Sequence, residues 1–293
     1  MGKVDFIGIG AQKAATTWLH HVLSEHSSVT TNDTKELNFF TANYDRGYAW
    51  YESCFADAPP GNICGECSPT YFFSSDAPRR ARAYNEDLKL ICILRDPIGR
   101  VFSNHLHEIR KGHIAPSTSV EAGLAQNPAY VQQSQYKTNL ENWLQHFDRD
   151  ALLVLFSEEV AANPDESYDQ ICEHLGLSAR EGSEAISERF HENITYRNKT
   201  LQKSLRFGGD MMRSLGMGDG VKKLKTLPGL KQMLSMNKQH LNIMVPPPTS
   251  ETRERLANQF RPDMEFVAEL TGRETLPWST WSDLRPADAE QKG

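Results

Sequence analysis

The chain has 293 residues, with 32 basic and 38 acidic side chains and a formal net charge of −6. An apolar fraction of 39% is enough for a packed core, which argues against a disordered chain. Its apolar runs fall far short of the roughly 20 residues of a membrane-spanning helix, so we expect no membrane span. The acidic balance argues against general nucleic-acid binding. The length predicts one large domain, 1–293.

The strand and helix patterns alternate along the chain. Residues 4–10 are expected to form a short buried strand, and 16–25 a helix with Thr16 as N-cap. An apolar strand at 88–94 leads into a helical pattern at 98–111. Further elements are expected as helix 136–147, strand 151–156, helix 165–175 closed by Gly176, helix 251–261 capped by Thr249 or Ser250, and helix 263–271 closed by Gly272. This alternation predicts a parallel sheet flanked by helices.

The segment GIGAQKAATTWL, at 8–19, links the first strand to the first helix. Free backbone N–H groups and the helix dipole make such a turn a ready anion site. Lys13 adds a charge, and Thr16 and Thr17 add hydroxyl donors. The alternative is a plain turn of small residues. A magnesium-nucleotide loop would need Ser or Thr directly after the lysine, and this chain has two alanines there.

Arg95 ends the 88–94 strand, at the edge where open α/β sheets bind ligands. Ser103 follows eight positions later, and an arginine with a nearby hydroxyl suits a second phosphate. The alternative is a surface pair of Arg95 with Asp96 and an ordinary helical serine.

Charge is concentrated in one region. Residues 197–238 carry a net charge of +8, which leaves −14 for the remainder, and 197–244 hold six of the eight methionines. This composition predicts a basic, Met-rich flap over 197–248 that meets an anionic ligand and the second substrate; the alternative is a solvated basic face.

Four segments together resemble the sulfotransferases that use 3′-phosphoadenosine 5′-phosphosulfate (PAPS). They are QKAATTWL, KELNFF (35–40), GECSPTYFF (65–73) and ILRDPIGRVFSNH. They are most similar to the heparan-sulfate branch and its bacterial relatives, over nearly the whole chain and least securely over 178–245. The resemblance implies an α/β fold with a P-loop-NTPase-like central parallel sheet, PAPS as cofactor, and no required metal.

The resemblance also assigns roles. Lys13 would stabilise the leaving phosphate, Glu36 would be the general base, and His107 would support catalysis. Cofactor binding would fall on Gln12, Lys13, Ala14, Ala15, Thr16, Thr17, Trp18, Arg95, Ser103 and Tyr136. From the flap, we expect Arg197 or Lys199 to reach a cofactor phosphate. The chain departs from the family pattern at Ala15, often Gly, and at Cys67, which is Lys in some heparan enzymes.

Several readings stay open. The acceptor would be a hydroxyl or amine of a carbohydrate, or a small amphiphilic metabolite. The other functions considered are a P-loop kinase for a small metabolite and an inactive nucleotide-binding scaffold. Cys64 and Cys67 have the spacing of a metal or redox pair. The tryptophans Trp18, Trp143, Trp278 and Trp281 are expected to be packing residues.

The five cysteines are few and odd in number, and no export leader is visible after Met1. Both features predict a reducing, cytoplasmic setting.

Overall fold

The structure is a computed structural model that describes residues 3–32, 34–178, 194–196, 238–240 and 245–284. These residues group into two compact units. The first comprises the described parts of 1–105, 120–190 and 248–293; the second comprises those of 106–119 and 191–247. The expected flap, 197–248, lies largely outside the described residues.

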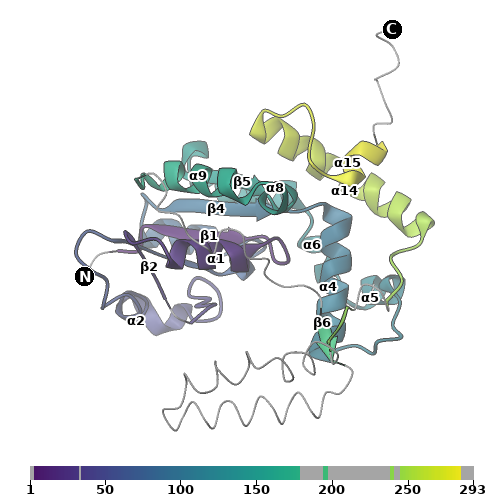
Figure 1. Ribbon diagram of the computed structural model, residues 1–293, viewed down its shortest axis with the longest axis horizontal. Helices are drawn as coiled ribbons and strands as arrows, with labels where there is room; N and C mark the ends of the chain where they lie inside the picture. Colours follow the sequence, from purple (N-terminus) through teal and green to yellow (C-terminus); the bar gives the residue numbers. More distant parts are fainter. Residues whose placement is uncertain (1–2, 33, 179–193, 197–237, 241–244, 285–293) are drawn as a thin grey trace, which may run out of the picture. The chain divides into compact units, whose positions relative to one another are not determined.

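The first unit is built on a five-stranded sheet in which every neighbouring pair is parallel (Figure 1). The strands are β1 (Phe6–Gly10), β2 (Val29–Thr31), β3 (Ile63–Cys67), β4 (Lys89–Leu94) and β5 (Leu152–Phe156), in the order β2-β3-β1-β4-β5. The predicted α/β fold with a central parallel sheet is confirmed.

Helices pack on this sheet. Helix α1 (Thr16–Ser24) contacts β1, β2 and β3, and α9 (Pro164–Leu175) contacts β4 and β5. The other helices are α2 (Gly47–Ser53), α3 (Ala77–Tyr84), α4 (Pro97–Lys111), α5 (Val120–Gln126), α6 (Ala129–Gln132), α7 (Tyr136–Leu144), α8 (Ser157–Ala162), α14 (Ser250–Thr271) and α15 (Ser279–Leu284). The second unit pairs β6 (Ile194–Tyr196) with β7 (Lys238–His240) in antiparallel register. No helix in the described ranges is long and apolar enough to cross a membrane.

Two predicted boundaries are wrong. Thr16 is the first residue of α1, and Ala15 takes the N-cap position without a side-chain hydrogen bond. The two helices expected at 251–261 and 263–271 are one helix, α14, with Pro262 inside it. The proline removes one backbone hydrogen bond. Phe260 and Met264, on either side of it, are both fully buried, and this packing keeps the helix continuous.

A third predicted boundary is also wrong, because the helix expected at 136–147 ends as α7 at Leu144. The predicted caps of α9 and α14 are confirmed. Thr249 caps α14, with its Oγ1 accepting a hydrogen bond from the Thr252 N–H at 3.2 Å. Gly176 and Gly272 end α9 and α14 in the left-handed conformation, which glycine adopts without steric cost.

The centre of the sheet is closely packed. A Cβ on Gly65 of β3 would lie 2.4 Å from the Phe6 ring of β1, so only glycine fits there. The four tryptophans expected to pack are indeed at most 5% exposed: Trp18, Trp143, Trp278 and Trp281. The carboxyl ends of β1, β3 and β4 therefore meet at one edge of a rigid sheet, where parallel sheets bind ligands.

Candidate functional site

The turn between β1 and α1 has an unusual backbone. Lys13 and Ala15 have φ angles of 73° and 57°, a region that residues with a Cβ rarely adopt. The Ala11 N–H donates to the Ile93 carbonyl at 2.7 Å, which ties the start of the turn to β4. The turn leads directly into the first turn of α1, which carries no acidic residue. The backbone and the helix dipole therefore suit an anion.

Lys35 contacts the same start of α1. The sequence analysis did not predict this contact. Its Nζ donates to the Thr17 hydroxyl at 3.2 Å and to the Thr16 hydroxyl at 3.5 Å. Burial lowers the pKa of Lys35, and the nearby Cys67, Glu36 and Glu66 oppose that shift. No ion pair of Lys35 is found among the described residues. Its position beside Glu36 in KELNFF could have indicated that Lys35 is a site residue. The sequence does not show, however, which turn that segment approaches.

Arg95 also meets the β1–α1 turn. Its Nη1 donates to the Lys13 carbonyl at 3.2 Å, and the fully buried Tyr136 donates its hydroxyl to the Arg95 carbonyl at 2.6 Å. The alternative surface pair with Asp96 does not form. The Asp96 carboxylate is buried and accepts hydrogen bonds from the Thr280 N–H and hydroxyl at 2.8 and 2.9 Å. The structure thus brings Lys13, Arg95 and Tyr136 together, and their expected roles in cofactor binding stay predictions.

Helix α4 carries the next two predicted residues. Ser103 is 4% exposed and belongs to the first unit. His107 belongs to the second unit, where its Nδ1 lies 2.9 Å from Arg110 Nη2. His105, on the same helix, is fully buried with its Nδ1 3.3 Å from the Tyr130 hydroxyl.

The roles expected of Ser103 and His107 stay predictions. Arg197 and Lys199 lie outside the described residues.

Glu36 is half-buried in an irregular loop between β2 and α2. Hydrogen bonds fix the residues that follow Glu36. The Asn43 side chain donates to the Leu37 carbonyl at 2.8 Å, and the Asn38 N–H donates to the Ser68 hydroxyl at 2.9 Å. Because Lys35 contacts the start of α1, the neighbouring Glu36 is held near that helix start.

Cys64 and Cys67 do not form a disulfide and are both buried. Burial raises the pKa of both thiols, that of Cys67 to about 12. Metal binding and redox exchange need a thiolate, so this environment disfavours both. Within the described ranges, no group of three or more His, Cys, Asp and Glu side chains is placed to hold a metal ion.

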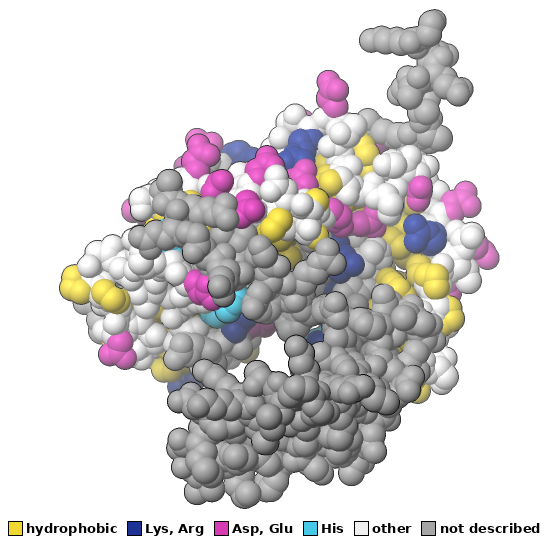
Figure 2. Space-filling view, in the orientation of Figure 1, with side chains coloured by type: hydrophobic (Ala, Val, Ile, Leu, Met, Phe, Trp, Pro, Cys, Tyr) yellow, Lys and Arg dark blue, Asp and Glu magenta, His cyan; other side chains and the backbone are white. Residues whose placement is uncertain are grey.

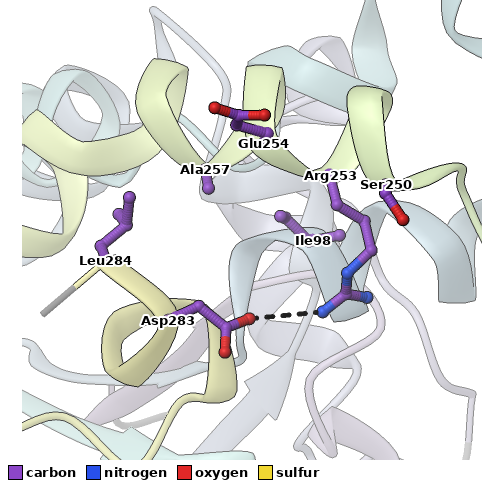
Figure 3. A pocket seen from close by; sticks show the side chains of 7 residues that line it. All are labelled: Ile98, Ser250, Arg253, Glu254, Ala257, Asp283 and Leu284. Atoms are coloured by element: carbon purple, nitrogen blue, oxygen red, sulfur yellow. Dashed lines mark ion pairs between the residues drawn. The ribbon is translucent and has the colours of Figure 1, made fainter. Parts of the chain in front are cut away.

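A pocket of about 260 Å³ lies elsewhere in the first unit, beside α14 (Figure 3). Arg253 and Asp283 form an ion pair at its wall, with 3.7 Å between Nη2 and Oδ2. None of the predicted site residues lines it.

Figure 2 shows acidic side chains scattered over the described surface, in line with the net charge of −14 outside 197–238.

Comparisons with known proteins agree with this geometry. Residues 3–219 match the family model described as "Sulfotransferase domain". Human heparan sulfate glucosamine 3-O-sulfotransferase 6 is 30% identical over 218 residues, covering 72% of this chain and 62% of that protein. Human heparan sulfate glucosamine 3-O-sulfotransferase 3B1 is 31% identical over 176 residues, covering 58% of this chain. The chain spans about half the length of the curated relatives it matches, 45% for the second.

A solved structure shows the same fold over almost the whole chain. The sulfotransferase from Alicyclobacillus acidocaldarius superposes with a TM-score of 0.66 at 20% identity, covering 94% of this chain and 98% of the other. Since the family model matches well over half of the sequence, the chain belongs to the sulfotransferase domain family.

Proposed function

We propose that this protein transfers the sulfuryl group of PAPS to a hydroxyl or amine of a carbohydrate-type or small-metabolite acceptor. One observation carries the proposal: three cationic side chains, Lys13, Lys35 and Arg95, belong to or contact a single turn at the start of α1.

The residues present fit a phosphosulfate donor. Lys35 and Arg95 make no ion pair among the described residues, and their hydrogen bonds go to hydroxyl and carbonyl oxygens. An anion at the turn would supply the missing negative charge. The lowered pKa of Lys35 points the same way, since an anion would favour its charged form.

Each residue has a task that its chemistry allows. When bound, the donor supplies the sulfuryl group and a phosphate leaving group that needs little protonation. Lys13 and the α1 N-terminus would stabilise charge on that phosphate, as preorganised donors do in phosphoryl transfer. Lys35 is a further cation at the same place. Arg95, with Ser103, would bind the 3′-phosphate, and Tyr136 holds the Arg95 backbone in position.

Glu36 is the proposed base. It would take the acceptor proton as the acceptor attacks sulfur in line with the leaving phosphate. Its half-buried place next to Lys35 keeps it at the anion site and open to an incoming substrate. The similarity to heparan sulfate 3-O-sulfotransferases supports a sugar acceptor. Cys67, which stands where some of that branch have Lys, leaves a small metabolite as the other acceptor class.

The direct test is transfer of labelled sulfate from PAPS into a panel of oligosaccharides and into a metabolite extract. Lys13→Ala and Glu36→Gln should each lower kcat by about 100-fold or more. The exposed Lys111 offers a matched control, and Lys111→Ala should leave kcat unchanged. Near-normal turnover in the Lys13 or Glu36 variant would remove that residue's role. Phosphate transfer from magnesium-ATP in place of sulfate transfer would instead support the hypothesis of a P-loop kinase for a small metabolite.

A further inference from the structure

Glu66 is a buried carboxyl group beneath the candidate site, and the proposed reaction leaves it without a role. It lies on β3 and is 2% exposed. It forms no ion pair within the described part of the chain. A buried carboxylate is costly unless hydrogen bonds compensate it, so its partners explain why it is tolerated.

Two hydroxyls supply these hydrogen bonds. Ser68 donates to Oε2 of Glu66 at 2.7 Å, and Tyr71 donates to Oε1 at 2.6 Å. The same two oxygens accept from the backbone of the Glu36 loop. Ser68 Oγ accepts from the Asn38 N–H at 2.9 Å, and Tyr71 Oη accepts from the Phe40 N–H at 3.3 Å. One carboxyl group is thus connected through two hydroxyls to two backbone amides.

The direction of these bonds depends on the carboxylate. A hydroxyl has one proton to donate, and an ionised carboxylate can only accept. Both protons therefore point to Glu66, which leaves the hydroxyl lone pairs facing the loop. A neutral amide at position 66 would donate to one hydroxyl, whose proton would then have to point elsewhere.

The Glu36 loop has other contacts as well, and its Phe39 and Phe40 side chains are fully buried. Glu36 to Asn38 form no regular secondary structure, and Asn38 has a φ of 50°. Its other hydrogen bonds include the Asn43 bond to the Leu37 carbonyl, the Thr70 hydroxyl that donates to Asn38 Oδ1 at 2.5 Å, and Arg80 Nη1, which donates to the Phe40 carbonyl at 3.0 Å. Since Thr70 lies between Ser68 and Tyr71, one short motif, 66–71, makes three of the contacts.

We infer that Glu66 is a positioning residue: its carboxylate orients the Ser68 and Tyr71 hydroxyls so that they hold the 36–40 backbone, and with it Glu36, in place. The part that concerns Glu36 rests on the proposed function; the hydrogen-bonded chain does not.

The conditions of the test follow from the groups around Glu66. The ionisable groups facing it are Glu36, Tyr51 and Tyr71, with Lys35 and Cys67 nearby. Burial raises the pKa of Glu66 to about 7, the bonds from Tyr71 and Ser68 oppose the shift, and Glu36 adds to it. Measurements at pH 8.5 keep this carboxyl group ionised.

The first experiment reads the backbone directly, by amide hydrogen exchange. Ser68→Ala should speed exchange at Asn38 about tenfold or more, and Tyr71→Phe should do so at Phe40. Glu66→Gln should speed both, and Glu66→Asp should restore part of the protection at each. Tyr84→Phe is the matched control, because the Tyr84 hydroxyl accepts from the Val4 N–H at 2.8 Å and should affect only that amide. Wild-type protection at Asn38 and Phe40 in Glu66→Gln would overturn the inference.

The second experiment links the chain to Glu36. Glu66→Gln should lower kcat at least tenfold, with the PAPS KM and the affinity for 3′,5′-adenosine bisphosphate within about twofold of wild type. Because Glu66 acts through Glu36, the double variant Glu36→Gln/Glu66→Gln should be no slower than Glu36→Gln alone. Multiplied losses would show that Glu66 acts by another route and would overturn the inference. If wild type transferred no sulfate while the exchange pattern held, the proposed function would fail and the hydrogen-bonded chain would stand.

Discussion

At the scale of single residues, the left-handed backbone of Lys13 and Ala15 is the clearest mark of a binding turn. A Cβ in this region costs on the order of 1–2 kcal/mol, and folded chains keep such strain mainly at functional sites. Ala15 occupies a position where the family often has Gly. The structure shows why Gly is suited to it: φ is positive there.

Ala15→Gly should therefore be neutral or raise the free energy of unfolding by up to about 1 kcal/mol, because relief of the strain competes with the extra freedom of the unfolded chain. Ala14→Gly is the control, since Ala14 is fully buried and outside the positive-φ set. It should lower that free energy by about 1 kcal/mol or more. Urea denaturation of both variants checks this, and equal losses would contradict the assigned strain.

At the scale of elements, Asp96 fastens α15 to the start of α4. Its carboxylate accepts from the Gly99 N–H at 2.8 Å, from both Thr280 donors and from the Ser279 hydroxyl at 3.2 Å. Asp96→Ala should lower the free energy of unfolding by about 2–4 kcal/mol, because several buried donors lose their partner. Asp96→Asn keeps one acceptor oxygen and should cost less. Thermal unfolding of both variants tests the order.

Helix α14 carries a second buried acid with a pH signature. Burial raises the pKa of Asp263 from 3.8 to about 6, although its Oδ1 accepts from the Lys137 N–H at 2.9 Å. The folded state then binds this proton more tightly than the unfolded state. The stabilisation is complete below pH 4 and is lost as pH rises towards 6.

Asp263→Asn should flatten that part of the pH dependence while keeping an acceptor for Lys137. Denaturant unfolding at pH 4, 5, 6 and 7 measures it. If wild type and variant had parallel curves, the raised pKa would be wrong.

At the scale of the whole molecule, the apolar strands and the turn chemistry were readable in the sequence, and the sheet order was not. Strands β1, β4 and β5 were predicted because each is a short run rich in apolar residues; glycines end the first, and polar residues follow the other two. Strand β3 was missed, since ICGEC contains Gly65 and Glu66, which local propensity disfavours in strands. Both are explained only by tertiary contacts: the Phe6 ring over Gly65, and the two hydroxyls on Glu66.

The candidate site also contains residues that the sequence predicted and one that it did not. Lys13 and Arg95 were predicted from their places after two apolar strands and from the resemblance to the sulfotransferase family. Lys35 was missed because its contact with Thr16 and Thr17 depends on how an irregular loop folds back.

Ligand binding should stabilise the molecule as a whole. At a concentration 100 times its Kd, 3′,5′-adenosine bisphosphate should raise the free energy of unfolding by about 2.7 kcal/mol, which corresponds to about 4–5 °C in Tm for a chain of this length. Arg95→Ala should lose most of that shift at the same concentration, and the exposed Arg79→Ala should keep it. A full shift in Arg95→Ala would remove Arg95 from the nucleotide site.

The contacts of the β1–α1 turn also bear on how the protein is made. Ala11 is bonded to Ile93, and Lys13 to Arg95, about eighty residues further along the chain. While the ribosome is still adding residues before 93, β1 has no β4 beside it and the turn has nothing to hold its left-handed backbone. A nascent chain of this length would lack the assembled turn. The turn at 8–19 would form only once β1, β3 and β4 have all left the exit tunnel, about eighty residues after the turn itself has been synthesised.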